Sequence, residues 1–385
     1  MSRVSTSSRW VTHVALALVV IQLATRAWVG FAGYFNLDDY VFYTRAAHLP
    51  LWSEDLLLSD YNGHLMPGSM IWVWLSTDRA PLNFAVVISV CLVLQLVIDL
   101  LMLVLLRRLF GNRLAILVPF TLFVATTMTL PAMVWWAAAL NQLPQQLFTL
   151  VAFLALLRYL RSERTAEAVL CSLAVVAGLA FSEKMALAMP LLFVFTWLFV
   201  VGGRLVQGLV ETTRRYVRLW AMFLLVGVAY TSYYVTQVDS PARGGATLQE
   251  AVELVDISIR RTVIPGLVGG PWTWKPLGVV DSLADPPVIA QVVAFALVGA
   301  VIAYSVWLSR GAYRAWALLA VGIFVEAALL LVSRVQVVGV EAVAAEYRYF
   351  TDLALVAAIA LGLAFLPIVT TFARGTPSIL TPAVH

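Results

Sequence analysis

The sequence predicts an all-α integral membrane protein, and three observations lead to that fold class. Of 385 residues, 62% are hydrophobic and only 12% are charged, whereas soluble domains carry about 25% charged residues. The apolar residues gather in runs of about twenty, the length that a helix needs to cross a hydrocarbon core of roughly 30 Å. Charged residues lie mostly between these runs. A soluble globular fold is therefore excluded.

Ten apolar runs are expected to form transmembrane helices, so that both termini lie on one side. The runs lie near residues 10–33, 84–106, 114–134, 143–160, 166–182, 185–203, 219–236, 288–308, 315–332 and 352–372. The first run has only Arg3 and Arg9 before it and lacks a small-residue cleavage site. We therefore expect a retained helix rather than a signal peptide.

The distribution of charge assigns a side to the termini. Fifteen bases and three acids share the side of the termini, against nine bases and sixteen acids on the other side. Because cytoplasmic loops are enriched in Lys and Arg, we expect both termini in the cytoplasm. Nearly all bases are arginine, which is typical of GC-rich bacteria, so the expected location is the bacterial inner membrane. The net charge of +4 is dispersed between apolar runs, and nucleic acid is not an expected partner.

The long outer segments divide the chain into four parts. We expect a transmembrane module over 1–236 with its first outer loop at 34–83, a long extracytoplasmic loop over 237–287, C-terminal helices over 288–372 and a cytoplasmic tail over 373–385. In the first outer loop, the apolar residues between 49 and 61 predict a further helix lying in the membrane interface. Cys91 and Cys171 fall inside apolar runs, so no disulfide framework and no metal site are expected.

Two adjacent acids, Asp38 and Asp39, directly follow the first apolar run. Paired carboxylates at this place are able to divide the work of general-base catalysis, one taking a proton from a hydroxyl and the other orienting it. The alternative is that they are solvated acids capping a short helix over 40–47. The pair alone leaves both interpretations open.

The surrounding loop resembles the first outer loop of the GT-C glycosyltransferases, particularly the protein O-mannosyltransferases and the aminoarabinose transferases. The resemblance rests on D-D-Y-V-F-Y from Asp38 and on D-Y-N-G-H-L-M-P from Asp60. It implies that Asp38 is the catalytic aspartate, that Asp39 accompanies it, and that His64 belongs to a His-Pro element. This chain departs from the mannosyltransferase pattern, because two residues separate His64 from Pro67.

The same resemblance implies a set of substrate-binding residues at the outer ends of later helices. Lys184, in F-S-E-K-M, would meet the phosphate of a lipid carrier, or else snorkel to headgroups. Arg348, in E-Y-R-Y-F, would clamp the phosphate bidentately, or else pair with Glu346 or Asp352. The expected substrate-binding set is completed by Asp60, His64, Glu183 and Tyr347.

Three further groups have two interpretations each. Four amides follow Trp135 and Trp136 in an expected surface hairpin, where they either bind sugar hydroxyls or cap helices behind an aromatic belt; they are Asn141, Gln142, Gln145 and Gln146. Trp272 and Trp274 follow a glycine-rich segment and form either a mobile lid or an interfacial anchor. Asp99 and Glu326 lie within apolar runs and are expected to have buried partners.

The reaction that the resemblance implies is displacement at the anomeric carbon of a polyprenyl-phosphate sugar at the extracytoplasmic face, with Asp38 as the base. The expected partners are this donor, membrane lipids and a glycan, lipid or protein acceptor. No cofactor is expected. The alternatives are a lipid-linked saccharide transporter, which would show polar residues at mid-span depth on several helices, and a non-catalytic accessory subunit.

Overall fold

The computed structural model is a bundle of helices and describes residues 2–238, 245–277 and 281–372. Eight helical segments of this part of the chain are long and apolar enough to cross a membrane. They are Arg9–Phe31 of α1 (Ser2–Phe31), α5 (Phe84–Phe110), α8 (Trp136–Ser162), Glu183–Val201 with α10 (Ala188–Phe195), α12 (Val217–Gln237), α15 (Val288–Leu308), Arg310–Ser333 with α16 (Tyr313–Ser333), and Tyr347–Phe365 with α19 (Thr351–Phe365). The all-α class is confirmed, and the eight helices indicate a multi-pass membrane protein; the predicted tail 373–385 lies outside the described residues.

Two of the ten predicted spans are shorter than expected. The segment 114–134 divides into a 3-10 turn, α6 (Leu117–Ala125), a second turn and α7 (Leu130–Val134). Thr126 is extended after α6, and Pro131, which has no N–H to donate, lies in the first turn of α7. The segment 166–182 gives α9 (Thr165–Leu179), which rises only about 22 Å. The expected ten spans thus become eight long helices and two shorter apolar segments.

The start of α8 also differs from the prediction. The expected surface hairpin before residue 143 is wrong, because α8 begins at Trp136 and includes the four amides. The carboxylate of Asp39 accepts the N–H of Ala137 at 2.8 Å and so satisfies a donor that the first turn of a helix leaves unpaired. Trp136 is fully buried, and its predicted place in an aromatic belt is wrong.

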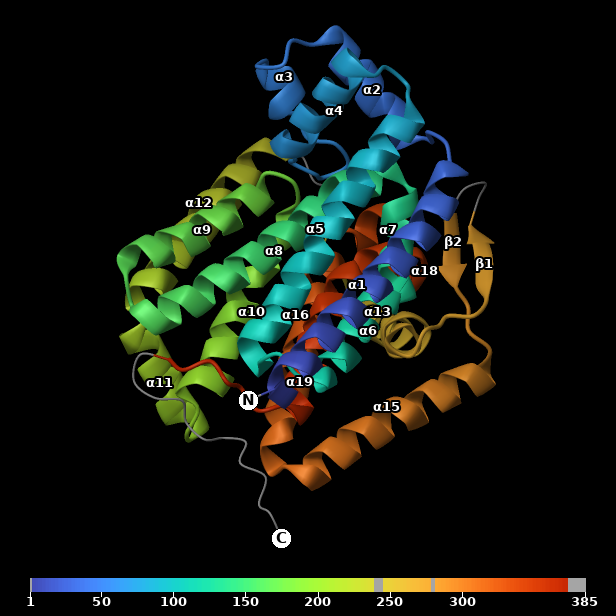
Figure 1. Cartoon of the computed structure of the whole chain (residues 1–385). Coiled ribbons are helices and arrows are strands. Elements are labelled where there is room, and N and C mark those ends of the chain that lie inside the picture. The colour runs from blue at the N-terminus through green and yellow to red at the C-terminus, as the bar shows by residue number, and fades with distance from the viewer. Residues whose placement is uncertain (1, 239–244, 278–280, 373–385) are drawn as a thin grey trace.

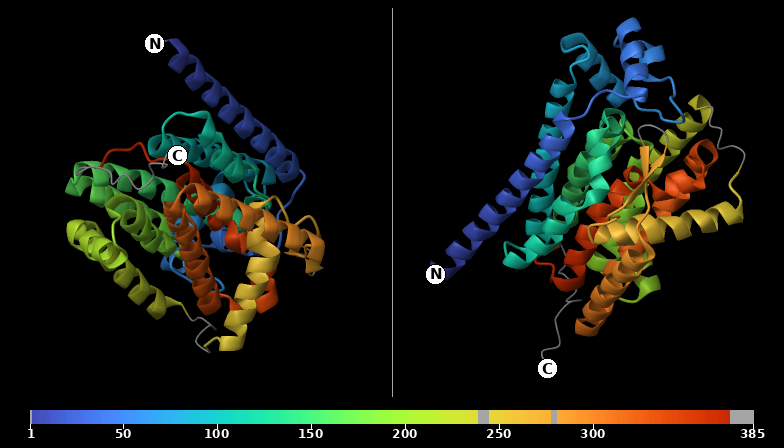
Figure 2. Two further views of the ribbon diagram at one scale, coloured as in Figure 1. Left: turned by 90° about the horizontal axis from the view of Figure 1, so that it is seen from below. Right: turned by 90° about the vertical axis from the view of Figure 1, so that its right-hand side faces the viewer.

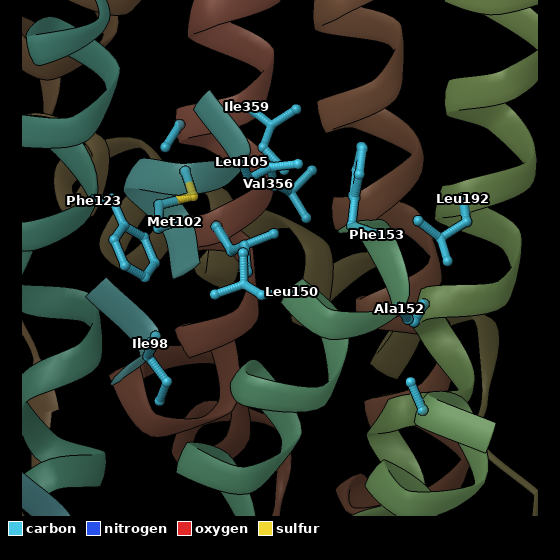
Figure 3. Close-up of a cluster of buried hydrophobic side chains, with 14 of the residues drawn as sticks. Ile98, Met102, Leu105, Phe123, Leu150, Ala152, Phe153, Leu192, Val356 and Ile359 are labelled. Carbon is cyan, nitrogen blue, oxygen red and sulfur yellow. The ribbon is translucent and has the colours of Figure 1, made fainter. Parts of the chain in front are cut away.

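The centre of the bundle is α19, which packs against α16, α6 and α8. Figure 3 shows Val356 and Ile359 of α19 meeting apolar side chains of neighbouring helices. Small residues let membrane helices approach closely. At Gly362 a Cβ would lie 2.5 Å from the ring of Phe110, so only glycine permits this contact between α19 and α5.

Two helices lie at the edge of the bundle. In α12 only Leu219 and Phe223 are buried, and in α15 only Ala294 and Ser305. Figure 1 shows α12 and α15 at opposite edges. Their exposed side chains are mostly apolar, and we therefore assign these faces to the lipid.

The segment predicted as the first outer loop forms a cap over one end of the bundle, which we call the outer end (Figure 1). It contains α2 (Asp38–His48), α3 (Glu54–Leu57) and α4 (Pro67–Arg79). The interfacial helix expected over 49–61 is reduced to α3, whose first turn begins where Ser53 accepts the N–H of Leu56. The start of α1 and the end of α19 lie at the opposite end of the bundle, and α1 projects from it (Figure 2).

The second outer segment is partly helical. It comprises α13 (Leu248–Ile257), a π-helical turn, α14 (Ile264–Leu267) and an antiparallel hairpin of β1 (Trp274–Leu277) and β2 (Asp281–Ala284). The apolar spacing that predicted a helix is confirmed by α13, which Thr247 and Glu250 cap reciprocally. The ring of Trp274 packs edge-on against Tyr347, at 5.2 Å between centroids. The remaining helices are α11 (Leu205–Arg215), α17 (Val335–Val338) and α18 (Val340–Ala345).

Candidate functional site

A cavity of about 900 Å³ lies between the cap and the outer ends of α8, α16 and α19; we call it the outer cavity. Its acidic, basic and histidine lining residues are Asp38, His64, Glu183, Lys184, Arg334 and Arg348. Aromatic, amide, serine and aliphatic side chains also line it, and such mixed walls are typical of sites that orient a polar ligand. Five of the predicted site residues are thus brought together in one space.

Asp38 is the first residue of α2, where the helix dipole favours negative charge. Its Oδ1 accepts a hydrogen bond from the hydroxyl of Tyr61 at 2.6 Å. Burial and this hydrogen bond raise the pKa of Tyr61 above its ordinary value, so the phenol keeps its proton and remains a donor. The pairing holds Asp38 as an acceptor at the wall of the outer cavity.

Asp39 has a different environment from its neighbour. It is fully buried and does not line the outer cavity. Its Oδ2 accepts the N–H of Asn36 and its Oδ1 the N–H of Ala137, each at 2.8 Å. Burial raises the pKa of Asp39 to about 7, although both backbone donors oppose the rise. In this structure Asp39 joins the start of α2 to the start of α8 and thereby positions Asp38.

His64, Glu183 and Arg334 form a connected cluster. The Nδ1 of His64 lies 3.0 Å from Oε2 of Glu183, and the guanidinium of Arg334 contacts the imidazole and lies 3.4 Å from Oε1 of Glu183. Burial lowers the pKa of His64, and the charge of Arg334 acts in the same direction, against Glu183. A neutral imidazole that donates from Nδ1 to Glu183 and accepts at Nε2 from Arg334 satisfies the hydrogen-bonding needs of His64, Glu183 and Arg334 together.

Arg334 is the functional residue that the sequence analysis missed. It follows α16 directly, donates to the backbone oxygen of Asn62 as well as to His64, and is almost fully buried. The turn that it holds has positive φ at Asn62 and Gly63, and Tyr234 donates to the Gly63 carbonyl at 2.5 Å. One sequence feature could have identified it. Arg334 is a lone base at the outer end of an apolar run, where the positive-inside trend predicts few bases.

Lys184 lies at the inner wall of the outer cavity, and its ammonium group has three partners. It donates to Asp352 at 2.9 Å and to the backbone oxygen of Tyr349 at 2.8 Å, and its Nζ lies 2.6 Å from Glu326. Two hydrogen bonds and one ion pair thus give the ammonium three partners. The expected buried partner of Glu326 is therefore Lys184.

A second, narrow and mainly apolar pocket adjoins this cluster; we call it the inner pocket. Lys184 lines both the outer cavity and the inner pocket. Gln145 and Gln146 of α8 also line the inner pocket, and each is buried with a side-chain oxygen that accepts no hydrogen bond among the described residues.

Arg348 precedes α19 in a 3-10 turn, as expected at the outer end of this helix. Its Nε lies 2.5 Å from Oε1 of Glu346, and its guanidinium stacks over Trp135, 4.3 Å from the ring centroid. The amide of Gln142 donates to the backbone oxygen of Arg348 at 2.6 Å. The predicted arginine before the last helix and one of the four predicted amides therefore lie together.

Two predicted substrate-binding residues do not line the outer cavity. Asp60 accepts the N–H of Gly63 at 3.2 Å and so closes the turn before His64. Tyr347 is fully buried beside Trp274. Both were expected from the resemblance, but neighbouring residues in a turn point in different directions, so His64 and Arg348 reach the outer cavity whereas Asp60 and Tyr347 do not.

Asp99 lies in a separate polar cluster inside the bundle. Gln95 donates to it at 2.8 Å and accepts from Arg26 at 2.8 Å, and Arg26 also contacts Thr129. Within residues 2–238, 245–277 and 281–372, His, Cys, Asp and Glu side chains do not gather in groups of three with metal-ligand spacing.

Comparison with known protein families and with curated proteins returned no match to this chain.

Proposed function

We propose that this chain is a membrane glycosyltransferase that moves a sugar from a polyprenyl phosphate to an acceptor hydroxyl at the extracytoplasmic face. The observation that carries the proposal is that Asp38, Arg334 and Arg348 line one outer cavity. A carboxylate supplies a base, and guanidinium groups suit a phosphate leaving group. The resemblance of the first outer loop to GT-C glycosyltransferases agrees with this chemistry.

The reaction is a displacement at the anomeric carbon. The acceptor oxygen forms the new bond to this carbon while its proton passes to the carboxylate of Asp38. The bond between the anomeric carbon and the phosphate oxygen breaks, and its electron pair stays on the polyprenyl phosphate. Tyr61, hydrogen-bonded to Asp38, holds the carboxylate in place.

Two arginines are the better candidates for the phosphate. The ammonium of Lys184 is already occupied by Glu326, Asp352 and a carbonyl. Arg348 and Arg334 each carry a planar guanidinium group, which suits a phosphate, and both line the outer cavity. We therefore assign the phosphate to Arg348 and Arg334, with Lys184 holding the floor of the cavity.

An apolar groove beside the His64 turn is a place for the lipid chain. It encloses about 800 Å³ and is lined by residues of the turn, of α9 and of α12. Leu65 and Pro67 flank it, and His64, directly before Leu65, lines the outer cavity. A chain lying along the lipid-facing α12 would thus reach the cavity with its phosphate.

The proposal places the enzyme in a bacterial inner membrane with both termini in the cytoplasm, and it takes membrane lipids and a glycan, lipid or protein acceptor as partners. A transporter of lipid-linked saccharides is the second candidate. The inner pocket favours it, because Lys184, Glu326 and two buried amides lie below the outer cavity.

The test is turnover by the purified chain in lipid nanodiscs, offered a panel of radiolabelled polyprenyl-phosphate sugars with and without acceptors. The enzyme proposal predicts release of polyprenyl phosphate. Donor binding without any release, together with flipping of a labelled donor in vesicles, would favour the transporter.

A further inference from the structure

A third cavity, which has about 1100 Å³ of space including open solvent, shares two wall residues, Trp135 and Arg348, with the outer cavity; we call it the side cavity. It lies at the outer end of α1, beside α7 and the β-hairpin, and has no part in the reaction proposed above. Val134 lines the side cavity and Ala137 lines the outer cavity. Trp135 therefore stands where the two spaces adjoin.

The side cavity lies close to the proposed base. Asn36 lines it, whereas Asp38, two residues later, lines the outer cavity. Residues two positions apart have Cα atoms at most about 7 Å from each other, a distance comparable to one sugar ring. A molecule seated in the side cavity is thus within one or two sugar units of Asp38.

The chemistry of the walls suits a polyhydroxylated ring. Trp135 offers a flat face, and its indole N–H has no partner among the described residues. Tyr34 is 72% exposed. Asn36, Ser282 and Glu346 line the same space and carry amide, hydroxyl and carboxylate groups. Aromatic faces match the C–H faces of a sugar, and the polar groups match its hydroxyl rim.

We propose that the side cavity binds the acceptor and that the acceptor is a saccharide. This inference rests on the proposed function and selects one acceptor class from those it allows. The wall between the two cavities is the stacked pair of Arg348 on Trp135, held by Glu346. A donor phosphate in the outer cavity competes with Glu346 for this guanidinium, and release of Arg348 from Trp135 joins the two spaces.

The experiment fills the side cavity at an exposed position. Ala32 lines the cavity and is exposed, so Ala32→Trp reduces the space without disturbing a packed core. Ala47→Trp is the matched control, because Ala47 is exposed on α2 and does not line the side cavity. The probes are neutral trisaccharides of glucose, mannose, galactose and arabinose, with binding measured by saturation-transfer NMR in nanodiscs.

The expected result is that at least one trisaccharide binds wild type and Ala47→Trp alike, and that Ala32→Trp weakens it about tenfold or more, a loss of about 1.4 kcal/mol. In the transfer assay the KM for that acceptor rises in Ala32→Trp while the donor Kd is unchanged. No binding of any probe, or equal binding by both variants, overturns the inference. The proposed function fails separately, when wild type releases no polyprenyl phosphate from any donor.

Discussion

Replacing Asp39 with alanine is expected to destabilise the fold rather than remove a catalytic group. The side chain is fully buried and accepts two backbone N–H groups, from Asn36 and Ala137. A hydrogen bond contributes about 1 kcal/mol when neutral and about 1.5–3 kcal/mol when one partner is charged. Losing both bonds therefore costs about 2–6 kcal/mol. Asp38→Ala loses only the bond from Tyr61 and should cost about 1–3 kcal/mol.

The free energy of unfolding is measured by titration of the purified protein with SDS in mixed micelles, at several pH values. Because the folded pKa of Asp39 is raised from 3.8 to about 7, its stabilising contribution is complete below pH 3.8 and is lost as the pH rises through about 7. The deficit of Asp39→Ala should thus be larger at pH 5 than at pH 8. A variant as stable as wild type at both pH values, but without activity, would refute the structural role.

Three further predictions follow from the clusters around the outer cavity. Lys184→Met leaves Glu326 as an uncompensated buried carboxylate and should cost about 3–5 kcal/mol of unfolding free energy. Adding Glu326→Gln should restore part of this loss. If the losses of the two single variants simply add in the double variant, the pairing is contradicted. The pKa of His64 is lowered by burial, so the contribution of His64 to stability is present above the unfolded pKa of 6.5 and is lost as the pH falls. Wild type should therefore lose stability below about pH 6.5 in SDS titrations, whereas His64→Gln should not. Stability-versus-pH curves of the same shape for both proteins would count against a neutral ring. Arg334→Lys removes a bidentate fork and should weaken donor binding about tenfold or more, whereas Arg260→Lys at an exposed outer site should not, as measured by donor Kd in nanodiscs.

Hydropathy alone predicted most of the bundle. The span expected at 288–308 coincides with α15 (Val288–Leu308), because an isolated apolar run of this length has no alternative to a helix in lipid. The segment 114–134 was equally apolar, yet it breaks at Thr126 and Pro131. The early start of α8 depends on Asp39, 98 residues away, and such a partner is invisible to a local pattern.

The candidate site was predictable only in part, and the reason is again distance along the chain. The loop motif and the outer helix ends identified Asp38, His64 and Arg348, which the fold brings to one cavity. Arg334 lies 270 residues from His64, and no short motif contains both. The division of labour within the acidic pair was also hidden, because it depends on which carboxylate meets the first turn of α8.

The most direct test of the central claim is single-turnover transfer by Asp38→Asn against wild type in nanodiscs, with donor Kd measured on the same samples. Asp60→Asn is the matched control, since Asp60 lies in the same loop but does not line the outer cavity. Loss of a positioned general base typically costs about 10²–10⁴-fold in rate. The account predicts such a loss for Asp38→Asn with donor binding intact and wild-type turnover for Asp60→Asn. Undiminished turnover by Asp38→Asn would contradict it.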